Sequence, residues 1–173
     1  KGNNMKKILL IVASLLTTSV ATAQDLISVT AQPHLYCLAQ NIYYEARGSS
    51  RADQMAVSDV VLNRVKDSRY PSSICEVVYQ GKQRPSWKDP NKMVMVRNMC
   101  QFSWYCDGKK DEPPEGDAWR NAQMVAYEMY YLYKDSNITD GATHYHAFYV
   151  KPEWAKRFIF KGRIGSHIFY KQK

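Results

Sequence analysis

The sequence predicts a single α+β domain with a helical first half and a small β-sheet in its second half. Apolar residues recur every three to four positions over 34–46, 52–66 and 117–133, which is the spacing of a helix. Residues 142–147 alternate as a β-strand does. The chain has 173 residues, 45% of them hydrophobic and 13% aromatic, which suits one globular domain with its own core.

The first residues resemble a secretory signal peptide. Met5-Lys6-Lys7 is followed by an apolar run over 8–16 and by Ala21-Thr22-Ala23. We expect cleavage before Gln24, so residues 1–23 would comprise an expression remnant or read-through plus the signal, and residues 24–173 the exported domain. The apolar run is shorter than the roughly 20 residues that span a bilayer, so no stable membrane span is expected after cleavage. An uncleaved signal anchor is the alternative.

The net charge favours an anionic partner. The formal charge is +8, and three of the positive charges, Lys1, Lys6 and Lys7, precede the expected cleavage site. A basic exported protein suits an anionic polymer such as a bacterial cell wall. Nucleic acid would also fit, but the basic residues are scattered and form no nucleic-acid motif, so we expect no nucleic-acid partner.

A glutamate lies on the apolar face of the first predicted helix, which begins at about His34. Glu45 falls on the same face as four apolar residues, Leu35, Leu38, Ala39 and Ile42. Burial and the negative end of the helix dipole both raise the pKa of a carboxyl group, which favours the protonated form that a general acid needs. Glu45 is therefore the candidate catalytic residue; the alternative is a structural pair with Arg47 or with another arginine at the edge of the core. Gly48 is predicted to end the helix in the left-handed conformation.

A second helix is predicted over residues 52–66, with Ser50 as its N-cap. Four valines form its buried side: Val57, Val60, Val61 and Val65. Asp53 and Asp59 are expected to be a helix-start group and a surface group.

The middle of the chain contains short elements. A short helix is predicted from about Tyr70 through Val78, ended by Gly81. Residues 82–91 contain two prolines and several charges, which indicates an exposed excursion. The aromatic residues of 101–105 favour a short strand, and 107–116 is a polar loop.

The last third carries a helix and strands. A helix is predicted over 117–133, and strand 142–147 follows the Asp140-Gly141 turn. Residues 152–154 are expected to turn, and 164–170 to close the chain as strand-like structure.

Four cysteines, an even number, indicate two disulfides in an oxidising compartment, with three alternative connectivities. We favour Cys100–Cys106 as a local loop closure and, by remainder, Cys37–Cys75. A zinc site is the competing interpretation, but no C-x2-C pair is present. We expect no metal and no cofactor.

Seven ordered blocks of the sequence resemble the SleB/CwlJ-type cell-wall hydrolases, which are spore cortex-lytic enzymes and their relatives in other bacteria and phages. The likeness runs from about Cys37 to Tyr170, and Lys82 to Met99 is longer than the family pattern leads us to expect. The blocks are residues 41–48, 56–65, 70–80, 101–104, 142–146, 152–155 and 164–170.

This resemblance implies a lysozyme-like, transglycosylase-type catalytic domain over 24–173 that acts on the glycan strands of peptidoglycan. It implies cleavage of the MurNAc-GlcNAc β-1,4 bond and no metal. The catalytic glutamate of the family's Tyr-x-Glu-Ala-Arg block matches Glu45. In such cleavage Glu45 would protonate the leaving glycosidic oxygen.

The fate of the sugar depends on a second carboxylate. A hydrolase needs one at about 5–9 Å, whereas a lytic transglycosylase uses the sugar's own 6-hydroxyl. Asp107 is the best rival for that role, since Glu76 and Glu153 are expected to be solvated. We therefore expect a lytic transglycosylase with Glu45 as its single acid and base; the alternative is a hydrolytic muramidase or glucosaminidase.

Several residues are candidates for binding the glycan. Gln101 and Ser103 share one side of the predicted strand and could bind sugar hydroxyls or an N-acetyl group; polarity at a strand edge is the alternative. Tyr145 alternates with His144 and His146. One histidine is expected to line the cleft, and a metal bound by both with Glu45 is the alternative.

Aromatic residues are further candidates, since flat rings stack on sugars. Tyr43, Trp104 and Trp154 could do so, with core packing as the alternative. His167 and Tyr170 are either packing anchors or site residues.

Other function classes stay open at this point. The chain could be a non-catalytic wall-binding module, or a metal-dependent amidase or peptidase that uses the histidines. We expect a monomer located in the periplasm, in the cell wall or outside the cell.

Overall fold

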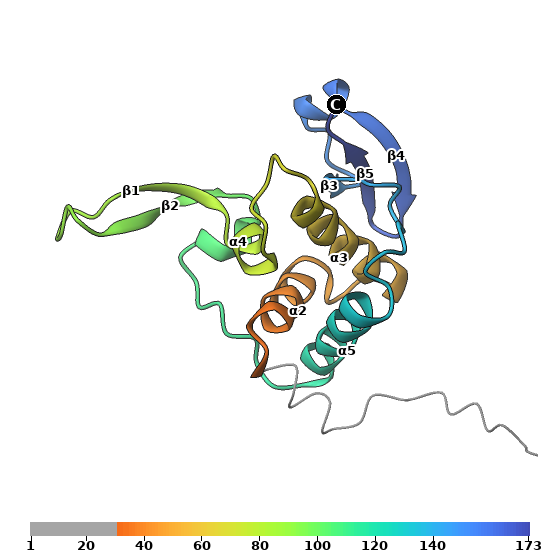
Figure 1. Ribbon diagram of the computed structural model, residues 1–173, viewed down its shortest axis with the longest axis horizontal. Coiled ribbons are helices and arrows are strands. Elements are labelled where there is room, and N and C mark those ends of the chain that lie inside the picture. The colour runs from red at the N-terminus through yellow and green to blue at the C-terminus, as the bar shows by residue number, and fades with distance from the viewer. Residues whose placement is uncertain (1–30) are drawn as a thin grey trace, which may run out of the picture.

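The computed structural model describes residues 31–173, so the predicted signal peptide and its cleavage site lie outside the described residues. Three helices pack together in one half of the body: α2 (Pro33–Ala46), α3 (Arg51–Lys66) and α5 (Asp117–Tyr131). The short helix α4 (Ile74–Val78) lies against α2 and α3 (Figure 1). The four predicted helices are confirmed. No helix in this part of the chain is long and apolar enough to cross a membrane.

The core lies where these helices meet. Leu38 and Ile42 of α2, Val61 of α3 and Met129 of α5 are fully buried in it. Burying such a side chain stabilises the fold by about 1.5–3 kcal/mol. The predicted apolar face of α2 is therefore the face that holds the helices together.

Local sequence explains where the helices begin. Pro33 occupies the first turn of α2, where its missing N–H costs nothing. The Ser50 hydroxyl accepts a hydrogen bond from the Asp53 N–H at 3.3 Å and caps α3, as predicted. The prediction for Gly48 was wrong. The residue that caps the C-terminus of α2 is Arg47, which has a right-handed conformation (φ −56°), and Gly48 does not have a positive φ. Instead, the Ser49 N–H bonds the Ala46 carbonyl and continues the turn.

The C-terminal part of the chain forms a three-stranded antiparallel sheet. Its order is β3 (His144–Ala147), β5 (His167–Lys171) and β4 (Ile159–Ile164). The strand predicted over 142–147 is confirmed. The strand-like stretch predicted over 164–170 contains the end of β4, a turn and most of β5, and β4 itself was missed.

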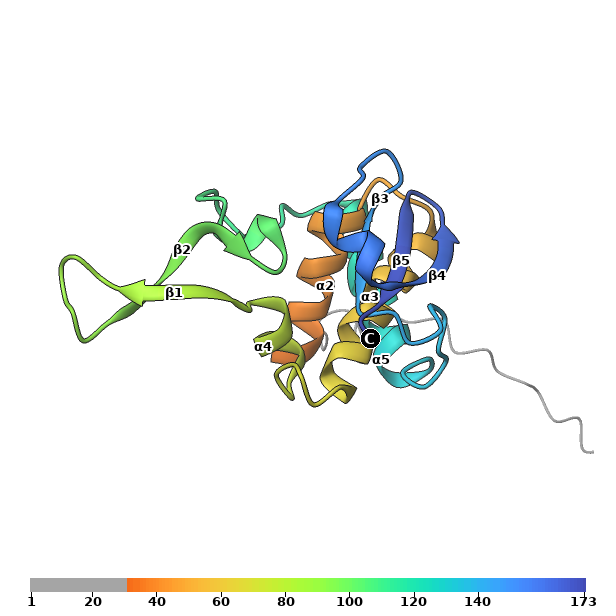
Figure 2. The ribbon, with the colours of Figure 1, turned by 90° about the horizontal axis from the view of Figure 1, so that it is seen from above.

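A two-stranded hairpin, β1 (Gly81–Pro85) with β2 (Met93–Cys100), projects from the body in both views (Figures 1 and 2). The expected exposed excursion is thus ordered as antiparallel strands. The strand predicted over 101–105 was wrong: Ser103–Cys106 form a 3-10 helix, η1, and the strand lies upstream as β2. A second 3-10 helix, η2 (Glu153–Arg157), takes the place of the expected turn.

Both favoured disulfides are present, Cys37–Cys75 between α2 and α4 and Cys100–Cys106 at the base of the hairpin. None of the four cysteines is free, so the competing zinc site does not form from them.

The two disulfides are expected to differ in their contribution to stability, because they close loops of different length. Cys37–Cys75 spans 38 residues and Cys100–Cys106 spans six. Loop-closure entropy predicts that the Cys37→Ser, Cys75→Ser double variant loses about 4 kcal/mol of unfolding free energy, against about 2 kcal/mol for the Cys100→Ser, Cys106→Ser variant. Urea unfolding of both variants measures the difference. A larger loss from the shorter loop would contradict this account.

Candidate active site

Glu45 lies in the last turn of α2 and faces strand β3. The Tyr145 hydroxyl donates a hydrogen bond to Glu45 Oε2 at 3.0 Å. The two residues are 100 positions apart in the chain, so this contact depends on how β3 is held against the helices. The alternative pair with Arg47 does not form; the Arg47 guanidinium instead lies 4.8 Å from the centroid of the Tyr43 ring.

The environment of Glu45 favours its neutral form. Burial raises the pKa of the Glu45 carboxyl above its ordinary value of 4.5, and the bond from Tyr145 and the charges of His167 and Arg64 offset only part of that effect. The expected direction is confirmed. Burial and the nearby Glu45 charge hold the pKa of Tyr145 well above its ordinary value, so Tyr145 stays a donor.

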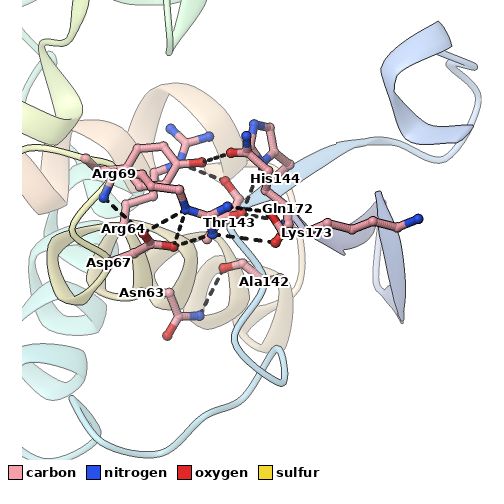
Figure 3. Close-up of polar contacts among 10 residues, drawn as sticks. Asn63, Arg64, Asp67, Arg69, Ala142, Thr143, His144, Gln172 and Lys173 are labelled. Carbon is pink, nitrogen blue, oxygen red and sulfur yellow. Dashed lines mark hydrogen bonds and ion pairs between the residues drawn. The ribbon is translucent and has the colours of Figure 1, made fainter. Parts of the chain in front are cut away.

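Arg64 of α3 is the buried cation of the site. Its Nε donates to the Thr143 carbonyl at 2.7 Å, while Asn63 donates to the Ala142 carbonyl at 3.0 Å (Figure 3). These bonds tie the entry of β3 to α3 and so place Tyr145 opposite Glu45. Arg64 is only 4% exposed, and its Nη1 has no hydrogen-bond partner within residues 31–173.

His144 forms an aromatic wall of the site. Its ring contacts Trp154 at 5.5 Å and Phe158 at 4.5 Å between ring centroids. Burial, followed by the positive charges of Arg64 and Arg69, lowers the pKa of His144 to about 4. His144 is therefore neutral at neutral pH and adds no charge beside Glu45.

These residues enclose a cleft of about 250 Å³. Gln101 and Ser103 lie at the start of η1 with exposed side chains, and buried Phe102 lies between them. Glu45 is the only carboxylate among the described residues that line the cleft. The lining consists of Glu45, Arg64, Gln101, Phe102, Ser103, His144, Tyr145 and Trp154.

The other acidic candidates lie elsewhere. Asp107 lines a separate pocket with Tyr44 and Arg47, and hydrogen bonds from Lys109 help to lower its pKa. Glu76 and Glu153 are exposed, as expected. Asp53 lies in the first turn of α3, as expected, and is also buried. The surface interpretation of Asp59 was wrong, since Asp59 is buried.

The two buried aspartates anchor the segments around β3 and β5. Asp53 accepts hydrogen bonds from the Ser166 N–H at 2.9 Å and His167 Nδ1 at 2.7 Å. Asp59 accepts from the backbone N–H of Thr139 at 2.9 Å and from its hydroxyl at 2.6 Å. His167 in turn packs against the Tyr145 ring, with centroids 5.0 Å apart. His167 is thus an anchor of the residue that holds Glu45.

Three predicted binding residues lie outside the cleft. Tyr43 and Trp104 are buried in the helical core, where Trp104 stacks on Tyr44 and donates from its indole N–H to Asn41 at 3.2 Å. His146 stacks on Tyr170 and lines a neighbouring apolar pocket. The structure therefore brings Gln101, Ser103, His144 and Tyr145 to Glu45, and does not bring these three.

Sequence reasoning gave Arg64 no role. Its position on the buried side of a helix was an available signal, because an arginine is almost never fully buried without a partner. Within residues 31–173, no group of three or more His, Cys, Asp or Glu side chains is arranged to hold a metal ion.

Comparisons with known proteins identify one family model and similar solved structures. A family model described as Cell Wall Hydrolase matches residues 48–170. The fold is similar to the catalytic domain of the germination-specific lytic transglycosylase SleB from Bacillus anthracis, with 22% identity and a TM-score of 0.56, over 81% of this chain and 95% of that one. The catalytic domain of the Bacillus cereus SleB protein has 22% identity and a TM-score of 0.53, over 81% of this chain and 91% of that one. No curated protein matches the chain.

Proposed function

We propose that this chain, which belongs to the cell wall hydrolase family and is an enzyme acting on peptidoglycan, cleaves the β-1,4 bond between N-acetylmuramic acid and N-acetylglucosamine as a lytic transglycosylase. The observation that carries the proposal is Glu45, a carboxyl group with a raised pKa and no second carboxylate beside it among the described cleft residues. The matched range begins three residues after Glu45, so its role rests on the geometry of the site and on the resemblance of its sequence block.

The proposed reaction needs one carboxyl group. Protonated Glu45 donates its proton to the glycosidic oxygen as the bond to C1 of the muramic sugar breaks and positive charge develops on that sugar. The sugar's 6-hydroxyl then attacks C1, and the Glu45 carboxylate takes its proton. The product is a 1,6-anhydro sugar, no water is consumed, and Glu45 returns to its starting state.

The remaining cleft residues would hold the glycan. The rim amide of Gln101 and hydroxyl of Ser103 are placed to hydrogen-bond sugar hydroxyls or an N-acetyl group. Arg64, whose Nη1 is itself buried, would support the cleft from behind by holding the Thr143 carbonyl and with it the entry of β3. Trp154 and His144 supply flat faces for a sugar ring.

Arg64→Gln is expected to lower kcat/KM on soluble glycan fragments by about tenfold or more, because the charged hydrogen bond that holds the Thr143 carbonyl, and with it Tyr145 opposite Glu45, is lost. In the wild type the Arg64 charge lowers the pKa of Glu45, so the substitution should raise that pKa further. The high-pH limb of the rate profile should therefore shift to higher pH. Arg120→Gln, which removes an exposed arginine paired with Asp117 in α5, is the control and should change neither quantity. An Arg64→Gln enzyme with unchanged kcat/KM and pH profile would show that Arg64 serves only packing.

We also propose that the chain is exported through residues 5–23, is cleaved before Gln24 and acts as a monomer. The two disulfides support an oxidising compartment.

Product analysis tests the function. Purified sacculi are digested with the full chain, and the released fragments are measured by mass spectrometry. Transglycosylation yields 1,6-anhydro ends, which are lighter by one water than the reducing ends that hydrolysis yields. Reducing ends would identify a hydrolytic muramidase or glucosaminidase, and intact sacculi with bound protein would identify a binding module.

A further inference from the structure

The hairpin of β1 and β2 is the largest feature that the proposed reaction does not use. It extends away from the helices and the sheet in both views (Figures 1 and 2). All of β1 after Gly81 is exposed, and no residue of β2 is fully buried. Both strands therefore present most of their side chains to solvent.

The hairpin carries a concentrated positive charge. Residues 81–100 contain five basic residues and one acidic residue, a net charge of +4, which is half of the formal +8 of the whole chain. In the described part of the chain none of the five forms an ion pair. The five are Lys82, Arg84, Lys88, Lys92 and Arg97. Unpaired charges of one sign on an exposed arm attract an anionic partner.

The tip of the hairpin presents an aromatic ring among these charges. Trp87 is 89% exposed, which makes it the most exposed large hydrophobic residue of the described chain. The Arg84 guanidinium lies 5.5 Å from its ring centroid. The tip is ordered by its own backbone, since the Ser86 N–H bonds the Lys92 carbonyl at 2.8 Å. An exposed indole beside cations suits a ligand that offers both sugar rings and negative charge.

The base of the hairpin is continuous with the cleft. Strand β2 ends at Cys100, and the next residues, Gln101 to Ser103, line the cleft of Glu45. The Cys100–Cys106 disulfide and the bond from the Gln101 N–H to the Gln80 carbonyl at 2.8 Å fix this junction. Gly81 permits the close approach, because a Cβ there would lie 2.7 Å from Cys100 Sγ.

We infer that the hairpin is a second binding arm for peptidoglycan, which contacts the wall beyond the strand held in the cleft. Its lysines and arginines would meet the carboxylates of the peptide stems, and Trp87 would stack on a sugar ring. This inference rests on the proposed function, since it assumes that peptidoglycan is the polymer in the cleft. It assigns a role to a segment that the chemistry in the cleft leaves unexplained.

The test separates binding from cleavage. Binding to sacculi is measured by co-sedimentation in a Glu45→Gln background, so that the polymer stays intact. Adding Lys88→Glu and Lys92→Glu should weaken binding about tenfold at low salt, and the difference should shrink as salt rises. Adding Trp87→Ala should weaken binding also at high salt, because stacking is not screened.

The control carries the same change of charge elsewhere. Lys134→Glu with Lys173→Glu alters two exposed lysines outside the hairpin and should leave binding within about twofold. With Glu45 intact, the Lys88→Glu, Lys92→Glu enzyme should cleave short soluble glycan fragments at the wild-type rate and intact sacculi more slowly.

Three results would overturn the inference. Unchanged sacculus binding by the hairpin variants would show that the arm does not touch the wall. An equal loss in the control would indicate net charge alone. Hairpin-dependent binding to phosphatidylglycerol vesicles with unchanged sacculus binding would show that the partner is a lipid surface. If sacculi bind but no variant cleaves them, the proposed function fails while the binding arm stands.

Discussion

Glu45→Gln is expected to abolish release of fragments from purified sacculi, with a loss of at least about 10³-fold, while the fold is kept. A glutamine has the size of glutamic acid but cannot donate a proton to the glycosidic oxygen or take one from the attacking hydroxyl. General acid–base catalysis contributes about 10²–10⁴-fold, and here one group would serve in both steps. The release rate, measured by chromatography of the soluble fragments, checks the expectation.

The same variant should be at least as stable as the wild type. The pKa of Glu45 is raised in the folded state, so its stabilising contribution is complete below the ordinary value of 4.5 and is lost as the pH rises through the folded-state pKa. Glutamine does not ionise, so the advantage of Glu45→Gln in melting temperature should grow with pH. Glu115→Gln changes an exposed glutamate and should alter neither activity nor melting temperature. A fully active Glu45→Gln enzyme would remove Glu45 from the mechanism.

Asp53→Ala is expected to cost about 2–6 kcal/mol of unfolding free energy, because each of two buried donors left without an acceptor costs about 1–3 kcal/mol. Asp53 is completely buried and accepts hydrogen bonds from His167 and the Ser166 N–H. Alanine would leave both donors without their acceptor in the interior of the fold. Activity should fall as well, because His167 packs against Tyr145.

A matched control for this substitution exists in α5. Asp117 also lies in the first turn of a helix, but its side chain is 98% exposed and pairs with Arg120. Asp117→Ala should therefore cost less than about 1 kcal/mol. Urea unfolding of both variants compares them, and equal losses would contradict the anchoring role of Asp53.

The catalytic candidate could be predicted because its signal is local. Apolar residues at helical spacing place Glu45 on the buried face of α2, whatever packs against that face. Its hydrogen-bond partner could not be predicted, because Tyr145 lies 100 residues away in the chain. Tyr145 is placed beside Glu45 by the hydrogen bonds of Asn63 and Arg64 to the residues that precede β3. The burial of Asp53 and Asp59 was missed for the same reason, because their partners His167 and Thr139 lie 114 and 80 positions away along the chain.

The strand predicted over 101–105 is incompatible with the Cys100–Cys106 disulfide that was predicted at the same place. Six extended residues would separate Cys100 and Cys106 by about 20 Å, whereas the Cα atoms of a disulfide lie about 6 Å apart. The observed separation is 6.1 Å, and the chain turns as η1 between the two cysteines. The apolar run from Met93 to Val96 was the available signal for strand β2. It was missed because the prolines and charges before it favoured an irregular segment.

The most direct test of the account is the pKa of the Glu45 carboxyl itself. NMR titration of the carbon-13-labelled full chain, with Glu45→Gln to assign the resonance, measures it. The account predicts a pKa above 4.5 that coincides with the high-pH limb of the rate on glycan fragments, and a still higher value in Tyr145→Phe, which lacks the bond that now lowers it. A Glu45 that titrates at or below 4.5, or away from the rate limb, would contradict the claim that burial keeps this group protonated for catalysis.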